Sequence, residues 1–263
     1  MTGHLIVLGS CGAWPEPGRA CSGFVVESDG FRVVVDLGYG TLSRLLAYVG
    51  TTNAAGIDAV LVTHRHADHA ADLHGLFRAR WFGARRAGPI PLYSPAGVIE
   101  MLVSMEEDPE QSRSNLEQVF DWHPLPHSDY DVGPLRLRSF ALPHWVPNAG
   151  IRLECEQFTV AFTGDCGPDP ALAELGRDAD LYVVEATDRE FGDEQAQGTA
   201  DRQPKFHLNA REAGQAAREA RARRLLLTHF WPGNDREKSL AAAATVFHGP
   251  IALAEEGQIH RLP

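Results

Sequence analysis

The chain has 263 residues, of which 44% are hydrophobic and 22% are charged, a composition typical of a folded globular protein rather than a disordered one. Its formal net charge is −11 at pH 7, which disfavours long nucleic acids as partners, because binding their phosphates needs lysine and arginine. It has no apolar stretch near the roughly 20 residues that cross a membrane and no signal-peptide pattern, so we expect a cytoplasmic protein without a membrane partner.

The N-terminal half alternates strand-like runs with helical segments. The runs rich in valine, isoleucine and phenylalanine predict strands over residues 5–10, 23–28, 31–38 and 57–64. The spacing of apolar residues predicts helices over residues 41–50 and 94–106. Residues 107–131 are polar and weakly periodic, and they predict a surface excursion without regular structure.

The C-terminal half repeats this alternation. Strands are predicted over residues 134–144, 150–156, 158–165, 180–187 and 224–230. Helices are predicted over residues 169–176, 209–222 and 237–247, and a closing hairpin over residues 250–262. The two halves resemble each other, since each begins with strands and later contains a strand that ends at a histidine. We therefore expect an α/β protein in which two related halves face one another in a single domain, residues 1–263.

The segment LVTHRHADHAADLHG, residues 61–75, concentrates metal-ligand side chains directly after a predicted strand. His64 and His66 are two residues apart, so on an extended segment they point the same way. Asp68 and His69 follow where the chain turns, and they can serve a second centre nearby. Imidazole and carboxylate groups suit Zn²⁺ and similar divalent ions. The pattern HxHxDH therefore predicts a metal site.

Further ligands should also lie at strand ends. His144 follows RSFALP, Asp165 lies in FTGDCG, and His229 ends LLLTH. A carboxylate has two oxygens, so Asp165 can bridge two cations. Read one at a time, Asp165 is an ordinary turn residue and either histidine is structural; the combination with the cluster favours a shared centre. We predict two divalent metal ions, with Zn²⁺ as the first choice and Mn²⁺ or Fe as alternatives.

HxHxDH followed by single His, Asp and His residues at strand ends resembles the metallo-β-lactamase superfamily over essentially the whole chain. The resemblance implies a four-layer αβ/βα sandwich, with a dinuclear site along one edge of two facing sheets. It also implies the two sets of metal ligands. One set is His64, His66, His144 and Asp165. The other is Asp68, His69, Asp165 and His229.

Two more segments, VVEAT (183–187) and HLNAREAG (207–214), are similar to motifs of the ribonuclease Z-like phosphodiesterase branch. This similarity implies that His207 contacts the scissile phosphate and protonates the leaving oxygen, while Glu185 orients it. The structural alternatives are a helix-cap histidine and a strand-end carboxylate. Ribonuclease Z carries a long basic arm before its bridging aspartate, but here only 21 positions separate His144 from Asp165. The chain more closely resembles compact bacterial cyclic-nucleotide phosphodiesterases that lack the arm.

These motifs predict a dinuclear hydrolase in which a metal-bridging hydroxide, held by Asp68, attacks a small phosphodiester such as a cyclic nucleotide or a short RNA. A homodimer is possible by analogy with the branch. Three alternatives remain open. The substrate can be a carbonyl compound such as a thioester, lactone or β-lactam. The enzyme can be a ribonuclease Z-like RNA endonuclease. The chain can also be a non-hydrolytic metal protein, either an iron oxygen-reducing enzyme or a regulatory nucleotide-binding module.

Residues around the cluster carry secondary predictions. Asp36 in VVVDLGYG is placed to hydrogen-bond a metal-bound histidine, whereas His74 lies either just behind the site or outside it. The arginine-rich segment 78–86 is either a solvated helix end or an anion-binding rim. Substrate preference should depend on three segments expected to form loops, residues 78–92, 107–131 and 188–206.

Overall fold

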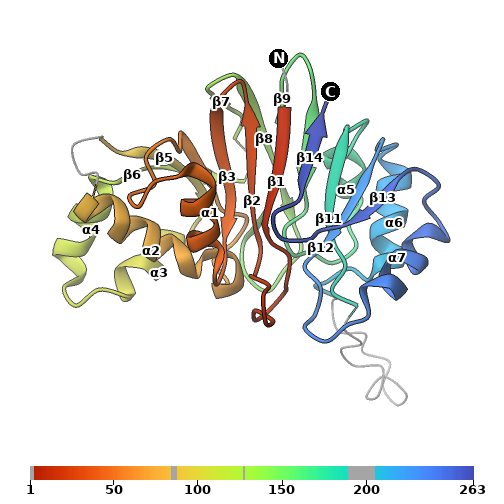
Figure 1. Ribbon diagram of the computed structural model, residues 1–263, viewed down its shortest axis with the longest axis horizontal. Coiled ribbons are helices and arrows are strands. Elements are labelled where there is room, and N and C mark those ends of the chain that lie inside the picture. The colour runs from red at the N-terminus through yellow and green to blue at the C-terminus, as the bar shows by residue number, and fades with distance from the viewer. Residues whose placement is uncertain (1–2, 84–87, 127, 189–204) are drawn as a thin grey trace.

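The computed structural model describes residues 3–83, 88–126, 128–188 and 205–263. Two sheets of seven strands each lie face to face, and helices cover their outer faces (Figure 1). Helices α1–α4 gather on one side of the molecule, and α6 and α7 lie on the other. No helix among the described residues is long and apolar enough to cross a membrane.

The first sheet is built mainly from the N-terminal half, with strand order β14-β1-β2-β3-β4-β5-β6. Its first four strands pair antiparallel and its last four pair parallel, with β3 common to both groups. The strands are β1 (Gly3–Gly9), β2 (Gly23–Ser28), β3 (Phe31–Leu37), β4 (Ala59–Leu61), β5 (Ile90–Pro95), β6 (Phe120–Leu125) and β14 (Ile259–Leu262). The helices of this half are α1 (Thr41–Val49), α2 (Ala67–Gly83), α3 (Val98–Ser104) and α4 (Pro109–Glu117).

The second sheet mirrors this plan, with strand order β13-β12-β11-β10-β9-β8-β7. Strands β7 to β10 pair antiparallel, and β10 to β13 pair parallel. The strands are β7 (Tyr130–Val132), β8 (Leu135–Leu142), β9 (Asn148–Glu154), β10 (Thr159–Phe162), β11 (Leu181–Glu185), β12 (Leu225–Thr228) and β13 (Ile251–Leu253). The helices are α5 (Ala171–Leu175), α6 (Ala210–Glu219) and α7 (Arg236–Ala244).

Alternation along the strands divides the buried side chains into layers. In β3, Val33 and Val35 enter the core between the sheets, while Val34 packs under the helices. In β11, Val183 faces the inter-sheet core and Val184 faces the helices of the second half. Three cores thus separate four layers, which confirms the predicted αβ/βα sandwich.

Two predictions for the middle of the chain are wrong. Ser94 and Pro95 belong to β5, because this run pairs with β6, and α3 begins only after Gly97. The segment 107–131 is not an irregular excursion, since it contains α4, β6 and the first two residues of β7. Only two of the nine α4 residues are buried, so its apolar period is too weak to reveal a helix.

The prediction of a closing hairpin over residues 250–262 is also wrong. β13 pairs parallel with β12 in the second sheet, whereas β14 pairs antiparallel with β1 in the first. Between them the chain crosses from one sheet to the other, with Ala254 N donating to Leu227 O and Gly257 N donating to Val7 O, both at 2.8 Å. A strand followed by a polar turn and another strand has the local signature of a hairpin, but the pairing partners here are distant in sequence.

Candidate metal centre

All the predicted site residues lie at one edge of the two sheets, most of them at or just after the end of a strand and His207 shortly before α6. This follows from the topology, because parallel strands of one sheet bring their carboxyl ends to the same edge. The first sheet contributes the segment after β4 and the first turn of α2. The second contributes the segments after β8, β10, β11 and β12. The residues brought together are His64, His66, Asp68, His69, His144, Asp165, Glu185, His207 and His229.

The first predicted ligand set forms one compact group. His66 Nδ1 lies 3.0 Å from His64 Nε2 and 3.0 Å from His144 Nε2. Asp165 Oδ2 faces the same point, at 3.8 Å from His64 Nε2 and 3.9 Å from His144 Nε2. One donor atom from each of the four residues therefore lies within 4.8 Å of all the others.

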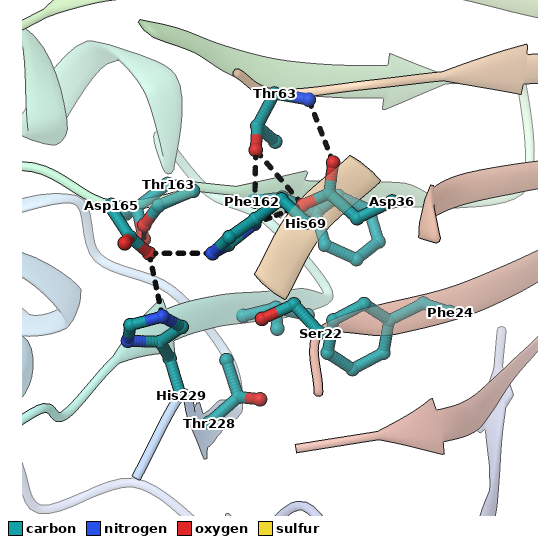
Figure 2. Close-up of a pocket in the computed structure, with 12 residues that line it drawn as sticks. Ser22, Phe24, Asp36, Thr63, His69, Phe162, Thr163, Asp165, Thr228 and His229 are labelled. Atoms are coloured by element: carbon teal, nitrogen blue, oxygen red, sulfur yellow. Dashed lines mark hydrogen bonds and ion pairs between the residues drawn. The ribbon is translucent and has the colours of Figure 1, made fainter. Parts of the chain in front are cut away.

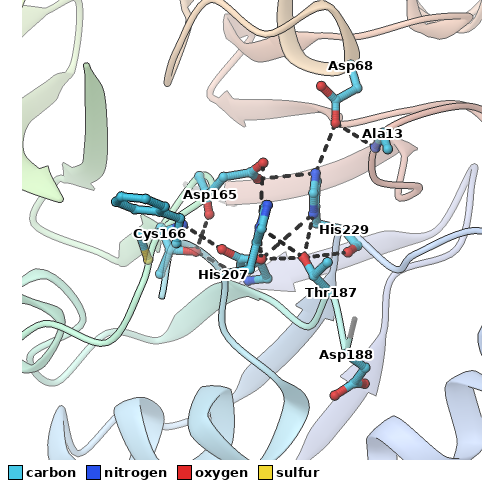
Figure 3. Close-up of polar contacts among 12 residues, drawn as sticks. Ala13, Asp68, Asp165, Cys166, Thr187, Asp188, His207 and His229 are labelled. Carbon is cyan, nitrogen blue, oxygen red and sulfur yellow. Dashed lines mark hydrogen bonds and ion pairs between the residues drawn. The ribbon is translucent and has the colours of Figure 1, made fainter. Parts of the chain in front are cut away.

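The second predicted set forms an adjoining group (Figures 2 and 3). Asp165 Oδ1 lies 3.0 Å from His69 Nε2 and 3.2 Å from His229 Nε2. Asp68 Oδ2 completes the group, at 3.1 Å from His229 Nε2 and 3.8 Å from His69 Nε2. Asp165 thus presents one carboxylate oxygen to each group, as a bridging ligand would.

The two groups fit divalent cations. Tetrahedral zinc with bonds of about 2.0 Å places neighbouring ligand atoms about 3.3 Å apart, close to the spacings within these groups. His69 Nε2 and Asp165 Oδ1 are both buried and make no hydrogen bond, although they are 3.0 Å apart. Buried polar atoms are almost always satisfied, so a cation between them accounts for the orphaned pair.

The charge states of three of these side chains suit a cation, whereas at His69 burial lowers the pKa but the Asp165 and Asp36 carboxylates outweigh burial and raise that pKa well above its usual value. Burial lowers the pKa of His64 well below its usual value and that of His144 to about 4, so both imidazoles are neutral at pH 7. Burial raises the pKa of Asp165, but His229 and His69 outweigh burial and hold that pKa well below its usual value. Neutral imidazole and ionised carboxylate are the forms that bind metal.

A second layer of hydrogen bonds orients the histidines. Asp36 Oδ2 lies 2.8 Å from His69 Nδ1, and Asp36 Oδ1 accepts from Thr63 N at 2.7 Å (Figure 2). The Thr63 hydroxyl donates to Asp36 Oδ2 at 2.9 Å and lies 3.1 Å from His64 Nδ1. These contacts leave Nε2 of both rings facing the ligand groups. Asp36 was singled out in the sequence, but Thr63 was not, although its position directly before HxHxDH was a usable signal.

Replacing Asp36 with asparagine should weaken zinc binding by about 10- to 100-fold, because an amide has one acceptor oxygen where the carboxylate has two. Asparagine tolerates the backbone of this position, where φ is 60°, so the fold should persist. Competition for zinc against a chelator measures the affinity. Asp58→Asn is the matched control, since Asp58 accepts from Arg32 N at the amino end of β4. Equal zinc affinities in the two variants would contradict the orienting role.

His207, which Figure 3 shows beside Asp165 and His229, forms a pair with Glu185. His207 Nδ1 lies 2.9 Å from Glu185 Oε2 and 3.9 Å from Asp165 Oδ2. Thr187, whose hydroxyl donates to Glu185 Oε2, also lies 2.9 Å from His229 Nδ1, so it links the pair to the predicted ligands. Burial lowers the pKa of His207, but the Glu185 carboxylate outweighs it and raises that pKa to about 9. Thr187 belongs to the quoted VVEAT motif, yet the sequence did not reveal its role.

Backbone groups also hold predicted ligands in place. Ala13 N donates to Asp68 Oδ2 at 2.6 Å, and Phe206 O lies 3.1 Å from His144 Nδ1. Gly38 permits the close approach of α2, since a Cβ there would lie 1.9 Å from Asp68 O. Nothing in the sequence marks these contacts, because each joins segments that only the folded sheets bring together.

Other residues singled out in the sequence lie away from the centre. His74 Nε2 is 2.6 Å from Glu106 Oε1, so it does not support the site. Arg78 pairs with the same glutamate, and Arg80 is buried and donates to backbone carbonyls of Ala54 and Gly88. Neither arginine forms an anion-binding rim at the site. The remaining arginines of that segment, and residues 189–204 of the expected loop at 188–206, lie outside the described residues.

Known proteins are similar to this chain in sequence and in fold. A family model described as the beta-lactamase superfamily domain matches residues 31–230. The protein ML1173 of Mycobacterium leprae is 30% identical, covering 98% of this chain and 88% of its own length. Ribonuclease Z of Mycobacterium bovis is 29% identical, with 98% of this chain and 97% of its own length covered.

The probable metallo-hydrolase YhfI of Bacillus subtilis is 28% identical, covering 95% of this chain and 96% of its own length. Its crystal structure superposes with a TM-score of 0.82, covering 99% of this chain and all of the other. The chain therefore belongs to the metallo-β-lactamase superfamily, as the HxHxDH motif predicted, and it is a metal-dependent hydrolase of that family.

Proposed function

We propose that the protein is a phosphodiesterase that binds two divalent cations, Zn²⁺ being the first choice, and hydrolyses small phosphodiesters. The observation that carries this proposal is the Glu185–His207 pair. Its histidine nitrogen, His207 Nδ1, lies 3.9 Å from Oδ2 of Asp165, the residue common to the two ligand groups. Hydrolysis of an alkyl phosphodiester expels a strongly basic oxygen, which needs a proton donor. A thioester, by contrast, expels a weakly basic thiolate and has less need of a dedicated acid at this place.

The proposed roles follow from the geometry. His64, His66, His144 and Asp165 would hold one cation, and Asp68, His69, Asp165 and His229 would hold the other. When bound, the two cations supply a hydroxide nucleophile at neutral pH and neutralise charge on the phosphoryl oxygens.

The remaining roles belong to protein side chains. Asp68 would position the nucleophile, since its carboxylate is fixed by Ala13 N at 2.6 Å. Glu185 forms a hydrogen bond with His207 Nδ1. This leaves His207 Nε2 as the nitrogen that would donate a proton to the leaving oxygen.

A small substrate suits this chain better than a long RNA. Between His144 and Asp165 the structure contains only β9, a tight turn closed by the hydrogen bond from Cys155 N to Phe158 O at 3.0 Å, and β10. No arm projects from this connection to hold an RNA. The net charge of −11 adds a general repulsion toward polyphosphates.

Zinc- or manganese-loaded protein should hydrolyse 3′,5′-cyclic AMP, and the activity should disappear on treatment with a chelator and return with added metal. Product formation is measured by chromatography. His66→Ala, which removes a predicted ligand, is the inactive control. A thioester, a lactone and a short precursor RNA are assayed in parallel with the cyclic nucleotide. Turnover of the thioester or the lactone alone, with neither the cyclic nucleotide nor the RNA hydrolysed, would overturn the proposed substrate class while leaving the metal site in place.

A further inference from the structure

An exposed tryptophan borders the proposed proton donor. Trp145 directly follows His144, and 56% of its surface is exposed. Its ring centroid lies 5.0 Å from that of His144 and 5.1 Å from that of His207. The ring centroid of Phe206, the residue before His207, lies 5.1 Å from that of Trp145. Two segments that supply site residues therefore bring a large aromatic surface against the histidine pair.

The exposed part of Trp145 is open to a ligand. Its three described ring contacts are inclined at 53° to 63°, so none of these neighbours stacks parallel on the indole. Exposed tryptophans are common, and Trp122 on β6 is 43% exposed without any contact to the predicted site residues among the described residues. Trp145 differs because two of its ring neighbours are a predicted metal ligand, His144, and the proposed acid, His207.

We infer that Trp145 is a stacking platform for a flat aromatic ring of the substrate, and that the ring is a nucleobase. The inference rests on the proposed phosphodiesterase function. If His207 protonates the leaving oxygen, the part of the substrate that carries this oxygen must lie beside His207, and hence against Trp145. A nucleoside places a base within reach of that oxygen. Since every base has a π face, this contact selects nucleotides over base-free diesters and discriminates weakly among the bases.

The test compares two substrates that differ only in the base. These are 3′,5′-cyclic AMP and methyl ribofuranoside 3,5-cyclic phosphate, which has the same phosphodiester ring. In Trp145→Ala, the ratio of the two kcat/KM values should fall by about 10- to 100-fold, mainly through a higher KM for the nucleotide. Trp145→Phe keeps a flat ring and should retain most of the ratio, whereas Trp145→Leu keeps only apolar bulk and should lose it.

Trp122→Ala is the matched control, because it removes a similarly exposed tryptophan from an edge strand of the other sheet. A ratio that stays constant in Trp145→Ala would overturn the inference. So would a parallel loss on both substrates, because that result would assign Trp145 to positioning His207 instead of binding a base.

A binding measurement separates this inference from the proposed function. Dissociation constants of zinc-loaded protein for AMP and for ribose 5-phosphate are obtained by calorimetry. If no phosphodiester is hydrolysed, the proposed function fails, yet a weaker affinity of Trp145→Ala for AMP alone would still support stacking. Equal affinities of the wild type and Trp145→Ala for AMP would overturn stacking, whatever the enzyme hydrolyses.

Discussion

Replacing Asp165 with asparagine should lower kcat/KM by about a thousandfold or more, which corresponds to about 4 kcal/mol of transition-state stabilisation. Asp165 is the one residue shared by both ligand groups, with Oδ1 3.0 Å from His69 Nε2 and Oδ2 3.8 Å from His64 Nε2. Asparagine has nearly the same volume, but it is neutral and turns an NH₂ group toward one set of imidazoles. Metal content, measured by mass spectrometry, should fall from two ions per chain to one or none.

Asp180→Asn is the matched control for this substitution. Asp180 is also buried, and it accepts hydrogen bonds from Thr159 N and Arg223 Nη1, both at 2.8 Å. It precedes β11 at the amino end, whereas the site lies at the carboxyl end. Asp180→Asn should therefore keep both metals even if its melting temperature drops. Two tightly bound ions and normal turnover in Asp165→Asn would disprove the bridging role.

The hydrogen bonds behind the ligand groups explain how a cluster of like-charged and titratable side chains stays in place. The two histidines that face Asp165 Oδ1 are supported from different halves of the molecule. His69 is held by Asp36 from the first sheet, and His229 is held by Thr187 from the second. The donor atoms are thus oriented by one partner within β3, Asp36, and one partner two residues beyond the end of β11, Thr187. Such preorganisation reduces the entropy lost when a cation binds, and it ties the geometry of the site to the packing of the two sheets.

Most of the site could be predicted from the sequence because its ligands lie in a short motif or directly after an apolar strand. The strand delivers the side chain to a shared edge, so local pattern and topology agree at His144, Asp165 and His229. The supports could not be predicted in the same way. Ala13 N and Asp68 are 55 positions apart, and their contact depends on how β1 and α2 pack rather than on any local pattern.

In the fold too, features that depend on a local sequence pattern could be predicted, whereas features that depend on contacts between distant segments could not. The strands and the four-layer arrangement follow from valine-rich runs that alternate between two cores. The hairpin predicted over 250–262 failed because β14 finds its partner in β1, at the other end of the chain. Helix α4 was missed because it rests on the surface of the first half and buries only Ser112 and Leu116. Pairing partners and lightly buried helices leave little trace in a single sequence.

Replacing His207 with alanine or glutamine should separate substrates by their leaving groups. On 3′,5′-cyclic AMP, whose leaving oxygen is a basic alkoxide, kcat should fall by about 10²- to 10⁴-fold, the usual contribution of a general acid. On bis(p-nitrophenyl) phosphate the leaving phenolate is weakly basic and departs without a proton, so kcat should fall by less than about tenfold. Metal content should stay at the wild-type value, because the two ligand groups do not need His207.

His74→Ala is the matched control, because His74 also contacts a carboxylate, Glu106 Oε1 at 2.6 Å, but lies away from the centre. It should leave both reactions unchanged. Glu185→Gln removes the negative charge 2.9 Å from His207 Nδ1 and should reproduce the leaving-group dependence in weaker form, by about 10- to 100-fold on the cyclic nucleotide. The difference between the two substrates identifies proton donation, since a residue that merely binds the phosphate serves both diesters equally. An equal loss on both substrates in His207→Ala would therefore assign His207 to phosphate binding and leave the leaving oxygen without its proposed donor.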